Sequence, residues 1–161
     1  FQPLVENAYD KMEKIASFKI DHTTLQRGIY VSRQDTMDDG EKITTYDIRV
    51  KEPNREPAMT PEVAHTIEHL AATYLRNDKE WKDKIVYFGP MGCLTGFYLL
   101  LKGDCSPEQI RPLLIDTFRF MAEFVGEIPG ATAQDCGNWL LHDLEGAKKE
   151  SEIFLARTLH G

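Results

Sequence analysis

The sequence predicts an α+β fold in which helices pack on a mainly antiparallel sheet. Two observations predict this class: strand-like segments form an early block, and helical segments lie between and after the strands. The 161 residues contain no internal repeat, no low-complexity tract and no long linker rich in proline, glycine and serine. We therefore expect a single domain over residues 1–161, long enough to bury about 68–70% of the surface that the unfolded chain exposes.

The composition limits the kinds of partner. Lys and Arg total 19 against 26 Asp and Glu, and this net charge of −7 argues against a protein that binds nucleic-acid backbones. No apolar run approaches the roughly 18–20 residues that span a bilayer. The three cysteines are odd in number and too widely spaced for a disulfide framework, which indicates a reducing compartment. We therefore expect a soluble cytoplasmic protein with no nucleic-acid or membrane partner.

The N-terminal part of the chain is predicted to be a short lead followed by strands. Residues 1–14 form an amphipathic lead segment with apolar residues at near-helical spacing. Residues 17–22 alternate polar and apolar side chains, which predicts a strand, and residues 28–32 predict a second one. Residues 34–41 are rich in Asp and Gly and read as a turn.

Residues 42–50 predict a strand with two distinct faces. Its apolar side chains point to one side and are Tyr46, Ile48 and Val50. Asp47 and Arg49 point to the other side. If the apolar side covers the core, we expect Asp47 and Arg49 on the outer or cleft-facing side of the sheet.

A central helix is predicted to begin after Thr60. Thr60 is a suitable N-cap, Pro61 fits the first helical position, and Glu62 adds a favourable negative charge to the first turn. We expect this helix to end at about Arg76 or Asn77. Its apolar side chains form one stripe and are Val63, Ile67, Leu70, Ala71 and Tyr74.

The second half of the chain is predicted to contain two more strands, 85–88 and 94–101, joined by a turn rich in glycine. Ser106–Gln109 has the spacing of a capping box and predicts another helix start. Pro112 predicts a kink in that helix or a later start. We expect residues 131–160 to be mostly helical, interrupted at Gly137 and Gly146.

His65, Glu68 and His69 form the clearest chemical pattern, and they predict a metal site on the central helix. Residues four apart project from one helical face, so His65 and His69 can bind one metal ion. Glu68 lies close to the same face and can act as a general base beside the metal. This is the His-x-x-Glu-His order of the inverted zincins. The alternative interpretation is a solvated face that carries two histidines by chance.

The three cysteines are candidates for the remaining chemistry. A catalytic metal site usually has three protein ligands and one open position, so a third ligand must come from elsewhere in the chain. Cys136 is a candidate because Gly137 lets the backbone approach closely, although a buried, inert cysteine is the alternative. Cys93 follows a glycine-rich turn, where a nearby cation would lower its pKa and make it an acid or base. The alternative for Cys93 is a small core residue in a strand, and Cys105 receives no role.

Five motifs follow one another in order along the chain. They are Ser17-Phe18-x-x-Asp21-His22, Asp47-Ile48-Arg49, His65-Thr66-Ile67-Glu68-His69-Leu70, Gly89-Pro90-Met91-Gly92-Cys93-x-Thr95-Gly96-Phe97-Tyr98-Leu99, and Cys136-Gly137 followed by His142-Asp143-Leu144. Together they resemble the S-ribosylhomocysteine lyase (LuxS) family. The resemblance runs from about Ser17 to the C-terminal helix, and five ordered motifs are far more specific than any one of them.

The resemblance implies a set of site residues. Family members bind one Fe²⁺ per subunit, for which Zn²⁺ or Co²⁺ can substitute, and their ligands correspond to His65, His69 and Cys136. Cys93 and Glu68 correspond to the acid/base pair. The residues at substrate-binding positions are Ser17, His22, Arg49 and Arg76. The resemblance also implies a homodimer with two identical sites at the interface, to which the partner contributes the early strand.

The resemblance also implies a reaction. S-ribosylhomocysteine is converted to homocysteine and 4,5-dihydroxy-2,3-pentanedione, the autoinducer-2 precursor, by successive carbonyl shifts and β-elimination, which connects the family to the methyl cycle and quorum sensing. Each shift removes a proton next to a carbonyl, so a Lewis acid and positioned bases lower the barrier. On this scheme Cys93 exchanges carbon-bound protons, and Glu68 moves protons at the oxygens and the later carbon. Tyr87, Phe88 and Leu94 depart from the family pattern, which bears on recognition of the substrate's end group.

Two other functions are compatible with the metal motif. An inverted-zincin metallopeptidase uses the same helix, but it commonly takes a glutamate as third ligand and does not need Cys93. A non-catalytic domain with a structural zinc normally closes its site with four protein ligands, whereas this sequence offers three plausible ones.

Overall fold

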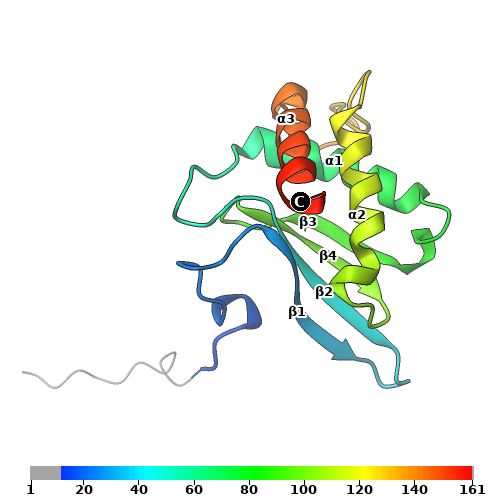
Figure 1. Cartoon of the computed structure of the whole chain (residues 1–161). Coiled ribbons are helices and arrows are strands. Elements are labelled where there is room, and N and C mark those ends of the chain that lie inside the picture. Colours follow the sequence, from blue (N-terminus) through cyan, green and yellow to red (C-terminus); the bar gives the residue numbers. More distant parts are fainter. Residues whose placement is uncertain (1–11, 161) are drawn as a thin grey trace, which may run out of the picture.

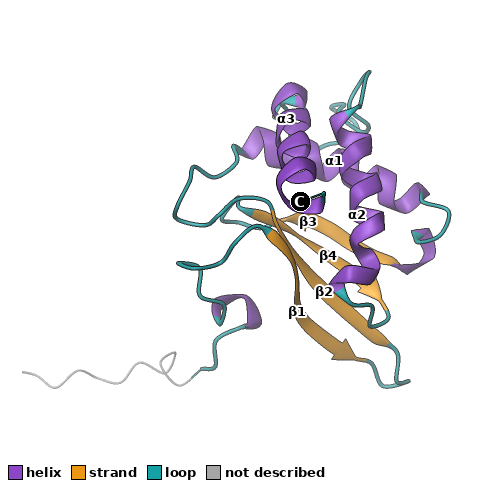
Figure 2. Ribbon diagram, in the orientation of Figure 1, coloured by secondary structure: helices purple, strands orange, loops and turns teal. Residues whose placement is uncertain are grey.

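The computed structural model describes residues 12–160, which form a four-stranded antiparallel sheet with three α-helices on one face (Figures 1 and 2). The strands lie in the order β1-β2-β4-β3. Their bounds are β1 Gly28–Thr36, β2 Lys42–Arg49, β3 Ile85–Pro90 and β4 Gly96–Lys102. The helices are α1 Pro61–Asn77, α2 Pro107–Ala122 and α3 Leu144–Phe154. The predicted α+β class, with helices on an antiparallel sheet in one domain, is confirmed.

The three helices begin where side chains satisfy their free N–H groups. The Thr60 hydroxyl accepts a hydrogen bond from the Val63 N–H at 3.2 Å, so α1 begins as predicted. Ser106 caps α2 with the full capping box, and α2 then continues through Pro112, so the predicted later start is wrong. Asp143 caps α3.

The core lies between the sheet and the helices. Alternate strand residues face the helices and are fully buried, among them Tyr46, Ile48, Phe97 and Leu99. Helix α1 buries the stripe that contains Ile67 and Leu70 against them. Each such side chain contributes about 1.5–3 kcal/mol to folding. Because this stripe fixes the rotation of α1, His65, Glu68 and His69 remain only partly buried beside the core.

Besides residues 34–36, which were expected in a turn and instead extend β1, two longer segments differ from the sequence prediction. Residues 17–22 are not a strand: a 3₁₀-helix, η2 (Ala16–Phe18), is followed by a turn in which the Asp21 carboxylate accepts hydrogen bonds from the Thr23 N–H and hydroxyl. This local side-chain bonding competes with strand pairing. Residues 131–143 form a loop rather than a helix. The predicted interruption at Gly146 is wrong, because Gly146 lies in the first turn of α3, where its N–H donates to the Asp143 carboxylate.

The two ends of the described chain lie outside the sheet and the three helices. Residues 1–11 of the expected lead segment lie outside the described residues. At the other end, α3 continues into a π-helical turn over Leu155–Leu159. Between residues 12 and 160, no helix has both the length and the apolar character required to cross a membrane.

Candidate active site

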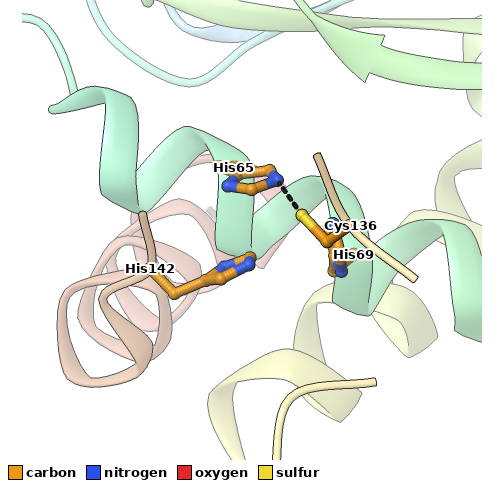
Figure 3. Close-up of side chains that lie close together, drawn as sticks. All are labelled: His65, His69, Cys136 and His142. Atoms are coloured by element: carbon orange, nitrogen blue, oxygen red, sulfur yellow. Dashed lines mark hydrogen bonds between the residues drawn. The ribbon is translucent and has the colours of Figure 1, made fainter. Parts of the chain in front are cut away.

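Helix α1 and one loop bring four side chains with metal-binding atoms together (Figure 3). His65 and His69 project from α1, and the loop between α2 and α3 supplies Cys136 and His142. Cys136 Sγ lies 3.4 Å from His65 Nε2, and the potential ligand atoms of all four residues lie within 4.8 Å of one another. The structure therefore brings together the three residues proposed from the sequence as metal ligands and adds His142.

Backbone carbonyl groups orient both α1 histidines. His65 Nδ1 lies 2.6 Å from the Leu141 carbonyl oxygen, and His69 Nδ1 lies 2.7 Å from the Pro129 carbonyl oxygen. A carbonyl oxygen can only accept, so each Nδ1 carries the hydrogen and each Nε2 carries the lone pair. Hydrogen bonding of the distal nitrogen to a carbonyl is the usual arrangement in metal-binding histidines. The donor set of two imidazoles and one thiolate therefore fits a bound transition metal.

His142 has a fixed tautomer as well. Its Nδ1 lies 2.9 Å from the Thr66 hydroxyl oxygen, and that hydroxyl donates its hydrogen to the Glu62 carbonyl oxygen. The Thr66 oxygen therefore accepts from His142 Nδ1–H, which leaves a lone pair on Nε2. This Nε2 is buried and has no hydrogen-bond partner among the described residues. Burial, and next the neighbouring His65 and His69, lower the pKa of His142 to about 4, so the ring is neutral at pH 7.

His142 lies against His65 within the same group. The two rings stack with their centroids 4.0 Å apart and an interplanar angle of 18°. His142 is therefore a fourth candidate ligand beside His65, His69 and Cys136. Three protein ligands with an open position are typical of a catalytic site, whereas four protein ligands are typical of a closed structural one.

Glu68 lies at a cavity beside the metal-binding group. This cavity has a volume of about 400 Å³ and is lined by Glu68, His69, Arg76 and Tyr87, among others. The Arg76 guanidinium donates to the Ile85 and Val86 carbonyl oxygens of β3, at 3.3 and 3.0 Å. Arg76 is thereby held at the wall of the cavity that Glu68 also lines, where a bound molecule would meet both a carboxylate and a cation.

A second cluster surrounds Cys93 on the face of the sheet opposite the helices. Arg49 and Asp47 form a doubly hydrogen-bonded ion pair in which both side chains are almost fully buried, with Nη2 to Oδ2 at 2.6 Å. Arg49 Nη1 donates to the Thr95 hydroxyl oxygen at 2.7 Å and lies 3.9 Å from Cys93 Sγ. The prediction that Asp47 and Arg49 lie on the outer side of the sheet is confirmed, although both are buried there.

The Cys93 thiol is presented by a tight turn. The Leu94 N–H donates to the Met91 carbonyl oxygen at 3.0 Å, and Leu94 adopts a φ of +62°, which is unusual for a residue with a side chain. Burial of the thiol raises the pKa of Cys93. The hydrogen bonds with Thr95 and the charge of Arg49 together lower it by more than burial raises it, so the net pKa is below its ordinary value. These contacts therefore favour the thiolate form of Cys93.

Ser17 and His22 join the Cys93 cluster rather than the metal-binding group. Both line a cavity of about 400 Å³ together with Arg49 and Cys93. This cavity shares no lining residue with the one that contains Glu68 and His69. Within one chain, the site residues predicted from the sequence thus gather in two separate groups.

Thr66, Thr95 and His142 belong to these groups but received no role from the sequence. Thr95 and His142 stand inside motifs that resemble the family, and Thr66 lies within the His-x-x-Glu-His motif itself. Their positions in these motifs were a usable signal. Their hydrogen bonds, however, join residues far apart in the sequence and are visible only in the fold.

The chain is similar to known proteins along almost its whole length. A family model described as S-ribosylhomocysteinase (LuxS) matches residues 15–161, which include every site residue predicted from the sequence. A protein named S-ribosylhomocysteine lyase from Phocaeicola vulgatus is 63% identical over 148 residues, which cover 92% of this chain and 91% of that protein. Proteins of the same name from Porphyromonas gingivalis (58% identical; 92% of each chain) and Clostridium beijerinckii (58% identical; 89% and 90%) are also similar.

Proposed function

The chain belongs to the S-ribosylhomocysteinase (LuxS) family, and we infer that it is a metal-dependent lyase that converts S-ribosylhomocysteine to homocysteine and 4,5-dihydroxy-2,3-pentanedione. One observation carries this conclusion beyond the family match. His65 and His69 hold their Nε2 lone pairs toward Cys136, because backbone carbonyls fix the other ring nitrogen. That arrangement supports a metal site with an open position for a substrate oxygen.

We propose Fe²⁺ as the metal, one ion per subunit held by His65, His69 and Cys136, with Zn²⁺ or Co²⁺ able to substitute. Imidazole and thiolate ligands suit each of these ions, so the donor set supports this group of metals without selecting one. When bound, the metal supplies a Lewis acid that stabilises negative charge on the substrate oxygens. The residues around it must then perform the proton transfers and hold the substrate.

In the proposed mechanism, Cys93 and Glu68 move the protons. The Cys93 thiolate takes a proton from the carbon next to a carbonyl and returns it to the neighbouring carbon. Glu68 moves protons at the sugar oxygens and assists the final elimination, in which the bond between carbon and sulfur breaks and homocysteine leaves. The Cys93 thiol, whose pKa is lowered, and the partly buried Glu68 carboxylate can both accept and return protons without redox chemistry.

The remaining polar residues are proposed to hold the substrate. Ser17, His22 and Arg49 line the Cys93 cavity and offer hydroxyl, imidazole and guanidinium groups to a polar ligand. Arg76 lines the cavity beside Glu68 and provides a cation for a negatively charged end group. These assignments explain why polar and charged residues from distant parts of the chain surround both cavities.

We propose that the enzyme is a homodimer in which each site combines the metal-binding group of one subunit with the Cys93 cluster of the other. The separation of the two cavities within one chain supports this arrangement, because the reaction needs both groups at one substrate. The outer sheet face also carries exposed apolar side chains beside its cavities, namely Ile15, Phe18 and Tyr87. Exposed apolar surface of this kind favours burial against another protein.

We also propose a cytoplasmic location. The three cysteines are free thiols, and the proposed chemistry needs Cys93 and Cys136 in the reduced state. A reducing compartment maintains such thiols.

The function is tested by incubating anaerobic, iron-loaded protein with S-ribosylhomocysteine and measuring released homocysteine as free thiol. We expect turnover that stops when a chelator removes the metal and returns when Fe²⁺ is restored. Heat-denatured protein with the same metal content is the control for uncatalysed release. If folded, metal-loaded protein releases no homocysteine, the proposed function is wrong.

The shared site is tested by complementation between two inactive variants. A Cys136→Ala subunit lacks the proposed metal site, and a Cys93→Ser subunit lacks the proposed base. In random mixed dimers, half the dimers are heterodimers with one intact site of two, so co-refolded mixtures should recover about a quarter of the wild-type activity. Homodimers of each variant serve as controls. Recovery of no activity, despite heterodimers detected by mass, would mean that each site lies within one chain.

A further inference from the structure

We propose that Thr95 is a positioning residue for Cys93, and that its hydroxyl donates a hydrogen bond to the Cys93 sulfur and holds it as a thiolate. The value of that thiolate for proton transfer rests on the proposed function. The hydrogen bond itself follows from the geometry around Arg49 and does not depend on the reaction. Thr95 would thus help to determine how readily Cys93 loses its proton.

The partner on the other side of Thr95 leaves the Thr95 hydroxyl hydrogen free to point at Cys93. A guanidinium group has only donors, so the Thr95 oxygen must accept from Arg49 Nη1, at 2.7 Å. The hydroxyl hydrogen is then available to another acceptor. Cys93 Sγ lies 3.1 Å from Thr95 Oγ1. Among the hydrogen bonds of residues 12–160, this sulfur is the one acceptor within reach of the Thr95 hydroxyl hydrogen, and a negatively charged sulfur accepts best.

A buried ion pair holds Arg49 in the orientation that this relay requires. Asp47 accepts from Arg49 Nε at 3.1 Å and from Nη2 at 2.6 Å, which leaves Nη1 directed at Thr95. The Thr95 side chain is itself buried, at 6% exposure, which limits competition from water. Asp47, Arg49, Thr95 and Cys93 therefore form one chain of hydrogen bonds that ends at the thiol.

Thr95 is a closer partner of the sulfur than Arg49. The distance from Arg49 Nη1 to Cys93 Sγ is 3.9 Å, compared with 3.1 Å from the Thr95 hydroxyl. Apart from the opposing effect of burial, the hydrogen bonds from Thr95 are the main cause that lowers the pKa of Cys93, ahead of the charge of Arg49. Arg49 thus acts in part through Thr95, by fixing which way its hydroxyl points.

The other titratable groups near Cys93 come from two further elements. His22, from the turn after η2, and Tyr98, from β4, line the same cavity as Cys93 and Arg49. Asp47 is paired with Arg49, so its negative charge is compensated. The wild type and the variants at Thr95 share all of these groups. A difference in the pKa of Cys93 between those proteins therefore reports on the Thr95 hydroxyl.

The test measures how the alkylation of Cys93 by iodoacetamide depends on pH. The proteins are metal-loaded wild type, Thr95→Val and Thr95→Ser, and mass spectrometry of the Cys93 peptide separates its reaction from that of Cys105 and Cys136. Thiolate reacts and thiol does not, so the midpoint of the rate profile gives the pKa of Cys93. We expect Thr95→Val to raise the midpoint by about one pH unit and Thr95→Ser, which keeps the hydroxyl, to retain the wild-type midpoint.

An unchanged midpoint in Thr95→Val, or an equal rise in Thr95→Ser, would overturn the proposal. Thr95→Ala is a second variant without the hydroxyl, and the rise must appear in whichever of the two has the wild-type circular dichroism spectrum. Unfolding of both would assign Thr95 to the fold and also refute the proposal. Because alkylation needs no turnover, a shifted midpoint in a protein that releases no homocysteine would refute the proposed function and leave this inference standing.

Discussion

Replacement of Cys93 with serine is expected to lower homocysteine release by about a thousandfold, in the range typical for loss of a general base. Serine has nearly the size of cysteine and can still bond to Thr95, so the turn and its cavity should be preserved. Its hydroxyl is a far weaker acid than a thiol, whereas Thr95 and Arg49 lower the pKa of Cys93 below its ordinary value and so favour the thiolate. The measurement is kcat for S-ribosylhomocysteine, together with metal content and subunit mass.

Cys105→Ser is the matched control for this prediction. Cys105 lies in the turn before α2, outside the residues that line the two site cavities, so its replacement should leave kcat near the wild-type value. The wild-type pH profile adds a second check. Activity should fall as the pH drops through the lowered pKa of Cys93, because the thiolate is then protonated. A Cys93→Ser enzyme with wild-type kcat would exclude Cys93 from the proton transfers.

The parts of the site that follow from local rules could be predicted from the sequence. The start of α1 depends on Thr60 and Pro61, and the common face of His65 and His69 depends only on helical spacing. The alternation of β2 placed Arg49 on the outer face in the same way. In each case, neighbouring residues determine the structure, so no distant contact was needed for the inference.

The parts that depend on distant contacts could not be predicted. The loop that carries Cys136 has no periodicity, and its path is set by bonds such as those from His65 to Leu141 and from His69 to Pro129. The alternating pattern of residues 17–22 predicted a strand, but hydrogen bonds to Asp21 produce a turn instead. Local propensity is a weak guide where side chains offer the backbone another partner.

The structure shows contacts of Arg49 that the sequence did not indicate. The alternation of β2 predicted Arg49 on the outer or cleft-facing side of the sheet, and the family resemblance implied that it contacts or orients the substrate. In the fold, its guanidinium is shared between Asp47, Thr95 and the neighbourhood of Cys93, so most of its donors are already engaged. A buried charge of this kind is maintained only by such partners. We therefore expect Arg49 to act on a bound substrate through Cys93 as well as through the edge that it presents to the cavity.

The largest loss of metal is expected in Cys136→Ala. Removal of the thiolate leaves two imidazoles on α1, which hold a divalent ion much more weakly than three ligands do, so the purified variant should lose its metal on dialysis and show no turnover. Metal binding also stabilises the fold by mass action: an ion at a hundred times its Kd adds about 2.7 kcal/mol. Addition of Zn²⁺ should therefore raise the Tm of metal-free wild type but not that of Cys136→Ala.

His142→Asn distinguishes an open site from a closed one. The proposed site uses His65, His69 and Cys136 as ligands and His142 only stacks on His65, so on this proposal removal of the His142 ring should leave metal content and the Tm increase close to those of wild type. A structural site with four ligands predicts the opposite, since loss of either Cys136 or His142 would break it equally. Equal metal loss in both variants would identify His142 as a ligand. The site would then have no open position for a sugar oxygen, and the lyase mechanism would lose its physical basis.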